Sequence, residues 1–96
     1  MNMKIKLSSK FRTKLERQVR YITKDKPGAA RKFKTDLLSE IRKISDYPYS
    51  FRPSIYFENE NIREMIFKRY IIIFRIDSEN KIILVFALLK HEDFSQ

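Results

Sequence analysis

The stretch NIREMIFKRYIIIFRID, residues 61–77, contains two apolar runs separated by a short basic step. β-branched and aromatic residues dominate both runs, and such residues fit the pleated surface of a sheet. The runs predict strands at about 62–67 and 70–76, with Lys68 and Arg69 as the hairpin turn between them. This stretch therefore predicts the antiparallel centre of a β-sheet.

A third strand is expected at about 81–89, after the turn-type residues DSEN at 77–80. The strands at 70–76 and 82–89 are apolar at nearly every position, so each has two apolar faces. Strands of this kind are usually buried on both sides. We therefore expect the protein's own helices to cover one face, and the other face to be an interface for a partner.

The first half of the chain predicts one strand and two amphipathic helices. Residues 3–7 alternate apolar and basic, and Ser8 or Ser9 offers a hydroxyl that can cap a helix start. Apolar residues then recur every three or four positions over 10–24 and 27–45, and Pro27 suits the first turn of the second helix. We predict one α+β domain over residues 1–96 with the order β-α-α-β-β-β. In it, a helical hairpin packs on one face of a small, mainly antiparallel sheet.

Composition narrows the possible function classes. The chain has 96 residues, no cysteine and one histidine, so we expect no disulfide, no metal site and no cofactor. No apolar run is long enough to span a membrane, and the N-terminus lacks the apolar part of a signal peptide. These features predict a cytoplasmic protein.

Positive charge is concentrated in the first half of the chain. Residues 1–53 carry fifteen Lys and Arg against five Asp and Glu, a net charge of +10. Residues 54–96 carry six against seven, a net charge of −1. Such asymmetry indicates a polyanionic partner, either a nucleic acid or an acidic protein. The alternative is that the charges only keep the outer helix faces solvated.

Two sets of residues resemble the RelE/ParE superfamily of toxins from type II toxin–antitoxin systems. The run YITKDKPGAARKF at 21–33 matches the superfamily's YI…D…P…AA…F pattern around the helix break. Arg63–Glu64–Met65 matches its R-E-hydrophobic pattern, and YIIIFRI at 70–76 matches its Y-x-I-x-aromatic-R-I pattern. Pro48 and Arg52–Pro53 fit the superfamily's loop, although Phe51 stands where many members carry a glycine. The similarity covers nearly the whole chain and is of the ParE-like, plasmid-stabilisation type.

The resemblance implies a small toxin that arrests growth and is neutralised by a cognate acidic antitoxin. ParE-like members poison DNA gyrase and have no known nuclease activity, whereas RelE-like and YoeB-like members cut messenger RNA in the ribosome. We expect gyrase poisoning. The alternative is a metal-independent, ribosome-dependent endoribonuclease, and a non-toxic basic nucleic-acid-binding module is a third possibility.

A nuclease needs groups that move protons and stabilise a charged phosphorane, and four residues are candidates. They are Arg52, Arg63, Arg75 and His91. For Arg63 and Arg75, the alternative to a catalytic role is a structural role or a salt bridge. Two features of the nuclease patterns are absent, since Ile71 stands where YoeB-like members carry an arginine and residues 44–67 contain no lysine. His91 is also one position beyond the usual histidine, so the chain favours a toxin that binds its target without cutting it.

Two binding surfaces follow from these expectations. Cations of the hairpin turn and of the end of the last strand are expected to bind the target: Lys68, Arg69, Lys90 and His91. Apolar residues of the first helix and of the sheet are expected to bind the antitoxin: Phe11, Leu15, Ile71, Ile73, Val85 and Leu89. The aromatic residues of 47–57 could stack on bases, but we expect their rings to tuck over the end of the core.

Overall fold

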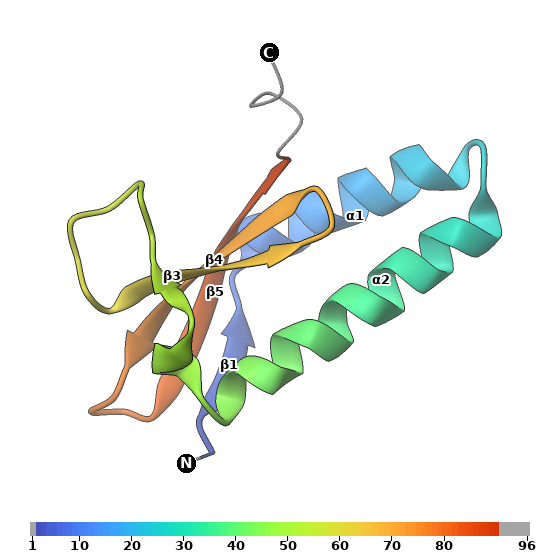
Figure 1. Cartoon of the computed structure of the whole chain (residues 1–96). Coiled ribbons are helices and arrows are strands. Elements are labelled where there is room, and N and C mark those ends of the chain that lie inside the picture. The colour runs from blue at the N-terminus through green and yellow to red at the C-terminus, as the bar shows by residue number, and fades with distance from the viewer. Residues whose placement is uncertain (1, 91–96) are drawn as a thin grey trace.

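A five-stranded sheet carries two long helices on one of its faces (Figure 1). The computed structural model describes residues 2–90. The α+β class and the order of the main elements are as predicted from the sequence. Along the chain lie β1 (Lys4–Leu7), α1 (Ser9–Thr23), α2 (Pro27–Arg42), two 3-10 turns (Lys43–Ser45 and Pro48–Ser50), β2 (Arg52–Pro53), β3 (Ile62–Phe67), β4 (Tyr70–Asp77) and β5 (Ile82–Lys90).

The sheet places the first strand beside the last, in the spatial order β1-β5-β4-β3-β2. The strands β3, β4 and β5 are antiparallel neighbours, as the hairpin turns predict. β1 runs parallel to β5 and pairs with it from Lys4↔Ile82 to Leu7↔Val85. The two-residue strand β2, which the sequence analysis did not predict, pairs with β3 at the opposite edge.

Local hydrogen bonds explain where the helices begin and end. The Ser8 hydroxyl accepts a hydrogen bond from the backbone N–H of Phe11 at 3.0 Å, which caps α1. Pro27 opens α2 at a position where its missing N–H costs nothing. After α2 the chain tightens into a 3-10 turn, and the Ser45 hydroxyl accepts a hydrogen bond from the N–H of Met3 at 3.0 Å. This bond fastens the end of the helical segment to the start of β1.

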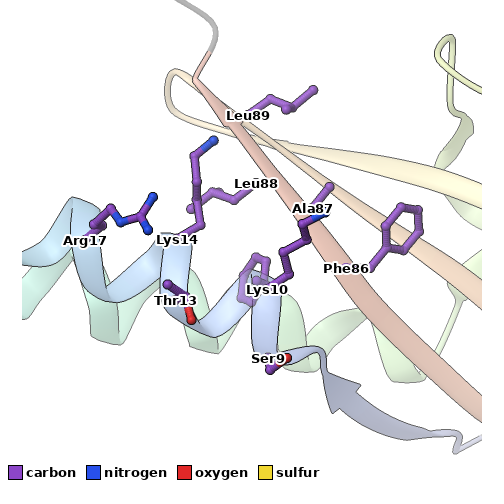
Figure 2. A pocket seen from close by; sticks show the side chains of 10 residues that line it. Ser9, Lys10, Thr13, Lys14, Arg17, Phe86, Ala87, Leu88 and Leu89 are labelled. Atoms are coloured by element: carbon purple, nitrogen blue, oxygen red, sulfur yellow. The ribbon is translucent and has the colours of Figure 1, made fainter.

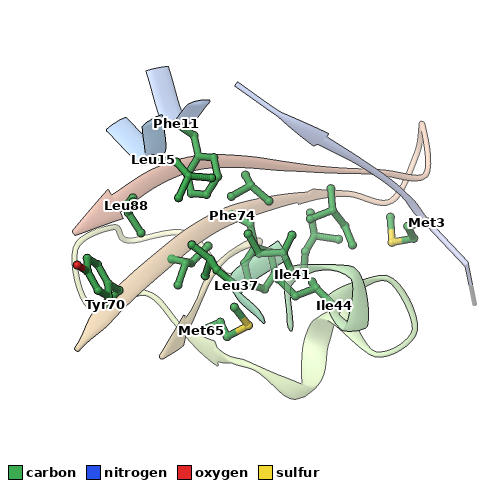
Figure 3. Close-up of a cluster of buried hydrophobic side chains, with 14 of the residues drawn as sticks. Met3, Phe11, Leu15, Leu37, Ile41, Ile44, Met65, Tyr70, Phe74 and Leu88 are labelled. Carbon is green, nitrogen blue, oxygen red and sulfur yellow. The ribbon is translucent and has the colours of Figure 1, made fainter. Parts of the chain in front are cut away.

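The main core lies between the helices and the inner face of the sheet, which we define as the face toward α1 and α2 (Figure 3). The predicted helical stripes supply one side, because Phe11 and Leu15 are buried in α1 and Phe33, Leu37 and Ile41 in α2. The inner side chains of the sheet fill the other side, and they include Met65, Tyr70, Ile72, Phe74, Ile76, Ile83, Val85 and Leu88.

The opposite, outer face of the sheet holds a second and smaller apolar cluster. Ile62, Ile71 and Ile73 are buried there, and Phe86, Ala87 and Leu89 are half-buried against them. Neither described helix packs on this face (Figure 1). Within residues 2–90, no helix combines the length and the apolarity that a membrane crossing needs.

Candidate functional site

A groove of about 750 Å³ runs between α1 and the second half of β5 (Figure 2). One wall is the strand segment 86–89, which supplies apolar side chains. The other wall is one face of α1, where Lys10, Thr13, Lys14 and Arg17 recur at helical spacing. The site therefore has an apolar wall opposite a basic wall.

Within the described part of the chain, no acidic side chain pairs with the cations of the basic wall. Lys10, Lys14 and Arg17 are exposed, and none of them forms an ion pair with a described residue. The one acid of α1, Glu16, instead bonds the Lys34 ammonium of α2 at 2.8 Å. That hydrogen bond and the Lys34 charge lower the pKa of Glu16. The carboxylate of Glu16 is thus engaged with α2 rather than with the groove cations.

The basic surface continues along α1 beyond the groove. A second hollow of about 410 Å³ is lined by Lys14, Arg17, Gln18, Arg20, Tyr21 and Lys24. Over residues 9–43, the helical hairpin carries twelve Lys and Arg against four Asp and Glu, a net charge of +8. This end of the molecule is therefore suited to an anionic partner.

Cations, hydroxyl groups and apolar side chains make up the described lining of the groove. No Asp, Glu or His of the described chain lines it, so it holds neither a general acid nor a general base of those types. Residues 2–90 also contain no group of three or more His, Cys, Asp and Glu that could hold a metal ion. Apolar area on one wall and unpaired cations on the other are the features of a surface for an amphipathic, acidic segment.

The six residues expected to bind the antitoxin are divided between three places. Phe11, Leu15 and Val85 belong to the main core, with 1%, 3% and 0% of their surfaces exposed. They present almost no surface because the stripe of α1 and the inner side of β5 face each other, although Phe11 also lines the groove. Ile71 and Ile73 lie in the outer cluster, where 1% and 2% of their surfaces are exposed.

Among the residues expected to bind the antitoxin, Leu89 keeps a partly accessible side chain. It is half-buried, packs against the outer cluster and also lines the groove. Its neighbours Phe86 and Ala87 have the same two roles, although the sequence analysis did not single them out. No signal for these two roles is present in the sequence, because they depend on the pairing of β1 with only the first part of β5.

Three of the four expected target-binding residues lie within the described chain. Lys68 and Arg69 form the exposed β3–β4 turn, where Lys68 has a φ of 54°. The Lys68 ammonium lies 5.3 Å from the centre of the Phe67 ring. Lys90 ends β5, and its ammonium lies 5.6 Å from the centre of the Tyr21 ring. His91 lies outside the described residues.

The candidate nuclease residues of the described chain, Arg52, Arg63 and Arg75, are divided between the two faces of the sheet. Arg52 bonds the buried carboxylate of Glu64, with its Nε 2.8 Å from Oε2. Arg63 pairs with Phe74 across the β3–β4 ladder and so belongs to the inner side of the sheet. Arg75 is the following residue of β4 and is exposed on the outer side. Arg63 and Arg75 therefore lie on opposite faces.

Arg63 has a structural role, which was one of the two alternatives in the sequence analysis. Its guanidinium donates hydrogen bonds to the backbone carbonyls of Glu60, Tyr49 and Phe51 at 2.8, 3.2 and 2.9 Å. It also lies 5.1 Å from the centre of the Tyr49 ring. One side chain thus connects both ends of the segment 49–60 to β3.

The aromatic loop differs from its predicted packing. Phe51 does tuck over the core, with its ring 5.7 Å from that of Phe74. Tyr47, Tyr49, Tyr56 and Phe57 instead keep between 40% and 73% of their surfaces exposed. The brace provided by Arg63 holds the backbone without burying these rings, so the expectation of a tucked aromatic cluster is correct only for Phe51.

Comparisons with known proteins were made for both sequence and structure. The family model described as "ParE toxin of type II toxin-antitoxin system, parDE" matches residues 5–93. No curated protein matches the chain in sequence.

Two solved structures share the fold. One belongs to the chromosomal ParDE TA system from P. aeruginosa, with a TM-score of 0.79, 19% identity, and coverage of 94% of this chain and 97% of the other. The second belongs to the toxin–antitoxin complex RelBE2 from Mycobacterium tuberculosis, with a TM-score of 0.63, 15% identity, and coverage of 94% and 99%. The similarity extends over nearly the full length of each chain.

Proposed function

The chain belongs to the ParE toxin family of type II toxin–antitoxin systems, and from this premise we propose that it arrests growth by binding DNA gyrase in the cytoplasm and is neutralised by an acidic antitoxin. The RelE/ParE fold is shared with solved toxin–antitoxin systems. The toxin class follows from the family, whereas the gyrase target, the antitoxin's chemistry and the cytoplasmic location are our proposals.

Two of the candidate catalytic arginines are engaged in structural contacts, and this observation favours gyrase over RNA cleavage. Arg52 is paired with Glu64, and Arg63 is bonded to three backbone carbonyls. A metal-free nuclease needs free cations converging on one phosphate, and each such group typically contributes about 10²–10³-fold in rate. A toxin that acts by binding needs a rigid scaffold with an exposed surface, and this chain provides both.

The β3–β4 turn is the part of the surface that we propose for target contact. Lys68 and Arg69 are exposed at the tip of a rigid hairpin, and Lys90 lies at the end of β5, where β5 pairs with Tyr70 just after that turn. Cations held at the end of a sheet can steer association with a negatively charged partner. An enzyme whose substrate is DNA provides such a partner in its DNA complex.

The antitoxin is proposed to occupy the groove between α1 and β5 and to extend over the outer face of the sheet. Charge complementarity supports this, because the wall of Lys10, Lys14 and Arg17 has no acidic partner among residues 2–90. Apolar complementarity supports it as well, since Phe86, Ala87 and Leu89 are only half-buried.

The decisive experiment induces the protein in a bacterial host and measures both target activities. We expect growth arrest, inhibited supercoiling by purified gyrase, and intact messages in primer-extension analysis. Codon-phased cuts that disappear in Arg75→Ala, with supercoiling unaffected, would instead establish the endoribonuclease. Arg75→Ala is informative because this exposed arginine can be removed without opening the core.

The turn residues can be tested with a matched pair of variants. Lys68 and Lys81 are both exposed, both lie in turns and both have a φ of 54°. Asparagine tolerates this left-handed conformation, so Lys68→Asn and Lys81→Asn change the charge equally with little strain. We expect Lys68→Asn to weaken gyrase inhibition, by at least tenfold when Arg69→Ala is added, and Lys81→Asn to leave it unchanged. Equal effects would contradict the assignment of the turn.

A further inference from the structure

The loop between β2 and β3 presents a run of large apolar side chains to solvent. Ile55, Tyr56 and Phe57, which we call the loop tip, keep 72%, 40% and 42% of their surfaces exposed. Figure 1 shows this loop at the end of β3 that lies opposite the β3–β4 turn. Single exposed apolar residues are ordinary on a protein surface, whereas three in succession form a patch of the kind that marks a contact with another molecule.

Hydrogen bonds hold the backbone on both sides of the loop tip. The N–H of Ser54 donates to the Ile62 carbonyl at 2.8 Å, and the N–H of Ile62 donates to the Asn59 carbonyl at 3.1 Å. The Arg63 guanidinium adds its bond to the Glu60 carbonyl at 2.8 Å. Apolar side chains on a backbone that is already ordered lose little entropy on binding, and such residues are effective anchors in protein interfaces.

An aromatic contact places the loop tip over the outer face of the sheet. The Phe57 ring meets the Phe86 ring edge-on, with the ring centres 5.7 Å apart. Phe86 packs against the outer cluster, so this contact joins the tip to β5. The exposed area of Ile55 and Tyr56 remains for a partner.

The charge around the loop tip favours a protein over a nucleic acid. Residues 54–61 carry Glu58 and Glu60 and no Lys or Arg. The nearest cations along the chain are Arg52 and Arg63, and both are already engaged, one by a carboxylate and the other by backbone carbonyls. Stacked bases need cations beside them for their phosphates, and carboxylates repel phosphates. The loop therefore differs from the basic helical hairpin in the partner that it suits.

We propose that the loop tip inserts into an apolar pocket, bordered by basic side chains, on the protein that this toxin acts on. This inference rests on the proposed function, in which that protein is gyrase. The six residues of β3 span roughly 20 Å, at about 3.3 Å per residue, so the tip and the Lys68–Arg69 turn are separate contacts. A second copy of this chain is a poor occupant, because a symmetric contact would bring Glu58 and Glu60 close to their own counterparts.

A matched pair of exposed residues tests the loop tip. Ile55 and Tyr47 have almost equal exposed fractions, 72% and 73%, but Tyr47 precedes β2 and lies outside the tip. We expect Ile55→Ser to weaken binding to purified gyrase at least threefold, and the further change Tyr56→Ser to weaken it at least tenfold and abolish growth arrest. Tyr47→Ser should leave both unchanged. Circular dichroism and urea denaturation check that each variant folds.

A second matched pair tests the charge of the pocket. Glu58→Lys and Asp25→Lys change the net charge equally, at exposed positions of the loop and of the helix break. A charge at the border of an interface acts mainly on the association rate, so Glu58→Lys should slow association with gyrase at least threefold at low salt. Asp25→Lys should not slow it. A faster association of Glu58→Lys would contradict a pocket bordered by basic groups.

Three outcomes would overturn the proposal. The first is growth arrest that persists in the variant with both Ile55→Ser and Tyr56→Ser. The second is stronger protection of Tyr56 from oxidative footprinting by single-stranded RNA than by gyrase. The third is a dimer in sedimentation that the same two substitutions disperse.

Two readouts separate a failure of this proposal from a failure of the proposed function. If the wild-type protein arrests growth without binding gyrase, and the doubly substituted tip variant does not arrest growth, the target is another protein and the tip remains its contact. If the wild-type protein does not arrest growth, the proposed function fails, and the assignment of the tip fails with it. Gyrase binding that is equal in the wild-type protein and the tip variant rejects the tip alone.

Discussion

The inner and outer faces of the sheet share the same strands but differ in what covers them. On the inner face, Ile72 and Phe74 of β4 are fully buried beneath α1 and α2. On the outer face, Ile71 and Ile73 are almost as well buried by neighbouring side chains, yet the apolar surface continues into half-buried residues and into Ile66, which is 50% exposed. The same strands thus form a covered core on one side and a partly exposed apolar surface on the other.

This difference shows why an apolar strand does not by itself identify an interface. Burial on the inner face is provided within the chain by two helices, so its side chains contribute to stability. On the outer face no helix of the described chain provides comparable cover, and the remaining apolar area is the kind of surface that a partner can bind. Substitutions on the two faces should therefore separate stability from partner binding.

Phe74→Ala is expected to have the largest effect on stability. Phe74 is fully buried and contacts the ring of Phe51, so its removal leaves a cavity and should cost about 3–5 kcal/mol in free energy of unfolding. Ile66→Ala on the outer face should change that free energy by no more than about 0.5 kcal/mol. Urea denaturation measures both free energies. Similar losses would mean that the two faces contribute equally to stability.

Arg52→Met tests the charged pair at the β2 edge of the outer face. Glu64 is 2% exposed, and its Oε1 has no hydrogen-bond partner within the described chain, so the carboxylate depends on Arg52 through Oε2. Removing one member of a buried pair typically costs about 3–5 kcal/mol, and the half-exposed Arg52 should bring the loss to about 1–3 kcal/mol. Arg75→Met is the matched control, and thermal unfolding should separate the two variants.

Glu64→Gln in the Arg52→Met background sharpens this test. The double variant removes the stranded charge while keeping the shape of the side chain, so part of the lost stability should return. If the double variant is less stable than Arg52→Met alone, the cost does not come from an unpaired carboxylate.

Arg63→Lys should loosen the aromatic loop with a smaller effect on global stability. An ammonium cannot reproduce the planar arrangement of donors that serves three carbonyls, so we expect a loss of about 1–2 kcal/mol. Faster proteolysis within 47–61 is the more specific readout. Unchanged proteolysis would show that the loop is held by other contacts, such as the bond between the Tyr49 hydroxyl and Asn61.

The smallest expected effect concerns the turn that follows β4. Hydrogen bonds from the side chain and the backbone N–H of Asn80 lower the pKa of Asp77. The stabilisation from this lowered pKa is present above the ordinary pKa of aspartate and is lost as the pH falls through the folded-state pKa. Asn80→Ala should raise the pKa of Asp77 toward its ordinary value in an NMR titration. The pKa of Glu16 should not move in this variant, because Lys34 is what lowers it.

Much of the fold could be predicted because local patterns and tertiary packing agree. The helical stripes through Phe11 and Phe33, the Ser8 cap and the β3–β4 hairpin are each specified by nearby residues. The pairing of β1 with β5 could not be read from such patterns, because it joins opposite ends of the chain. The two-residue strand β2 is too short to show any alternation.

The candidate site was less predictable because it depends on where elements end in space. In the sequence, Lys14 and Arg17 are only part of the positive charge of the first half of the chain. They line a groove because β1 ends at Leu7, paired with Val85, while β5 continues beyond it. Phe11, Leu15 and Val85 are apolar in the expected pattern but face inward. Sequence periodicity identifies the face of an element, whereas exposure depends on which neighbour covers it.

The position of β5 has a consequence for how the protein is made. β5 follows β1–β4 in the chain, yet it lies between β1 and β4 and hydrogen-bonds to both. While residues 82–90 are still in the ribosomal exit tunnel, β1 has no neighbour and the groove has no apolar wall. A growing chain therefore cannot present the finished groove before residues 86–89 have left the tunnel. A chain that stops before residue 82 lacks both the strand that joins β1 to β4 and the apolar wall of the groove.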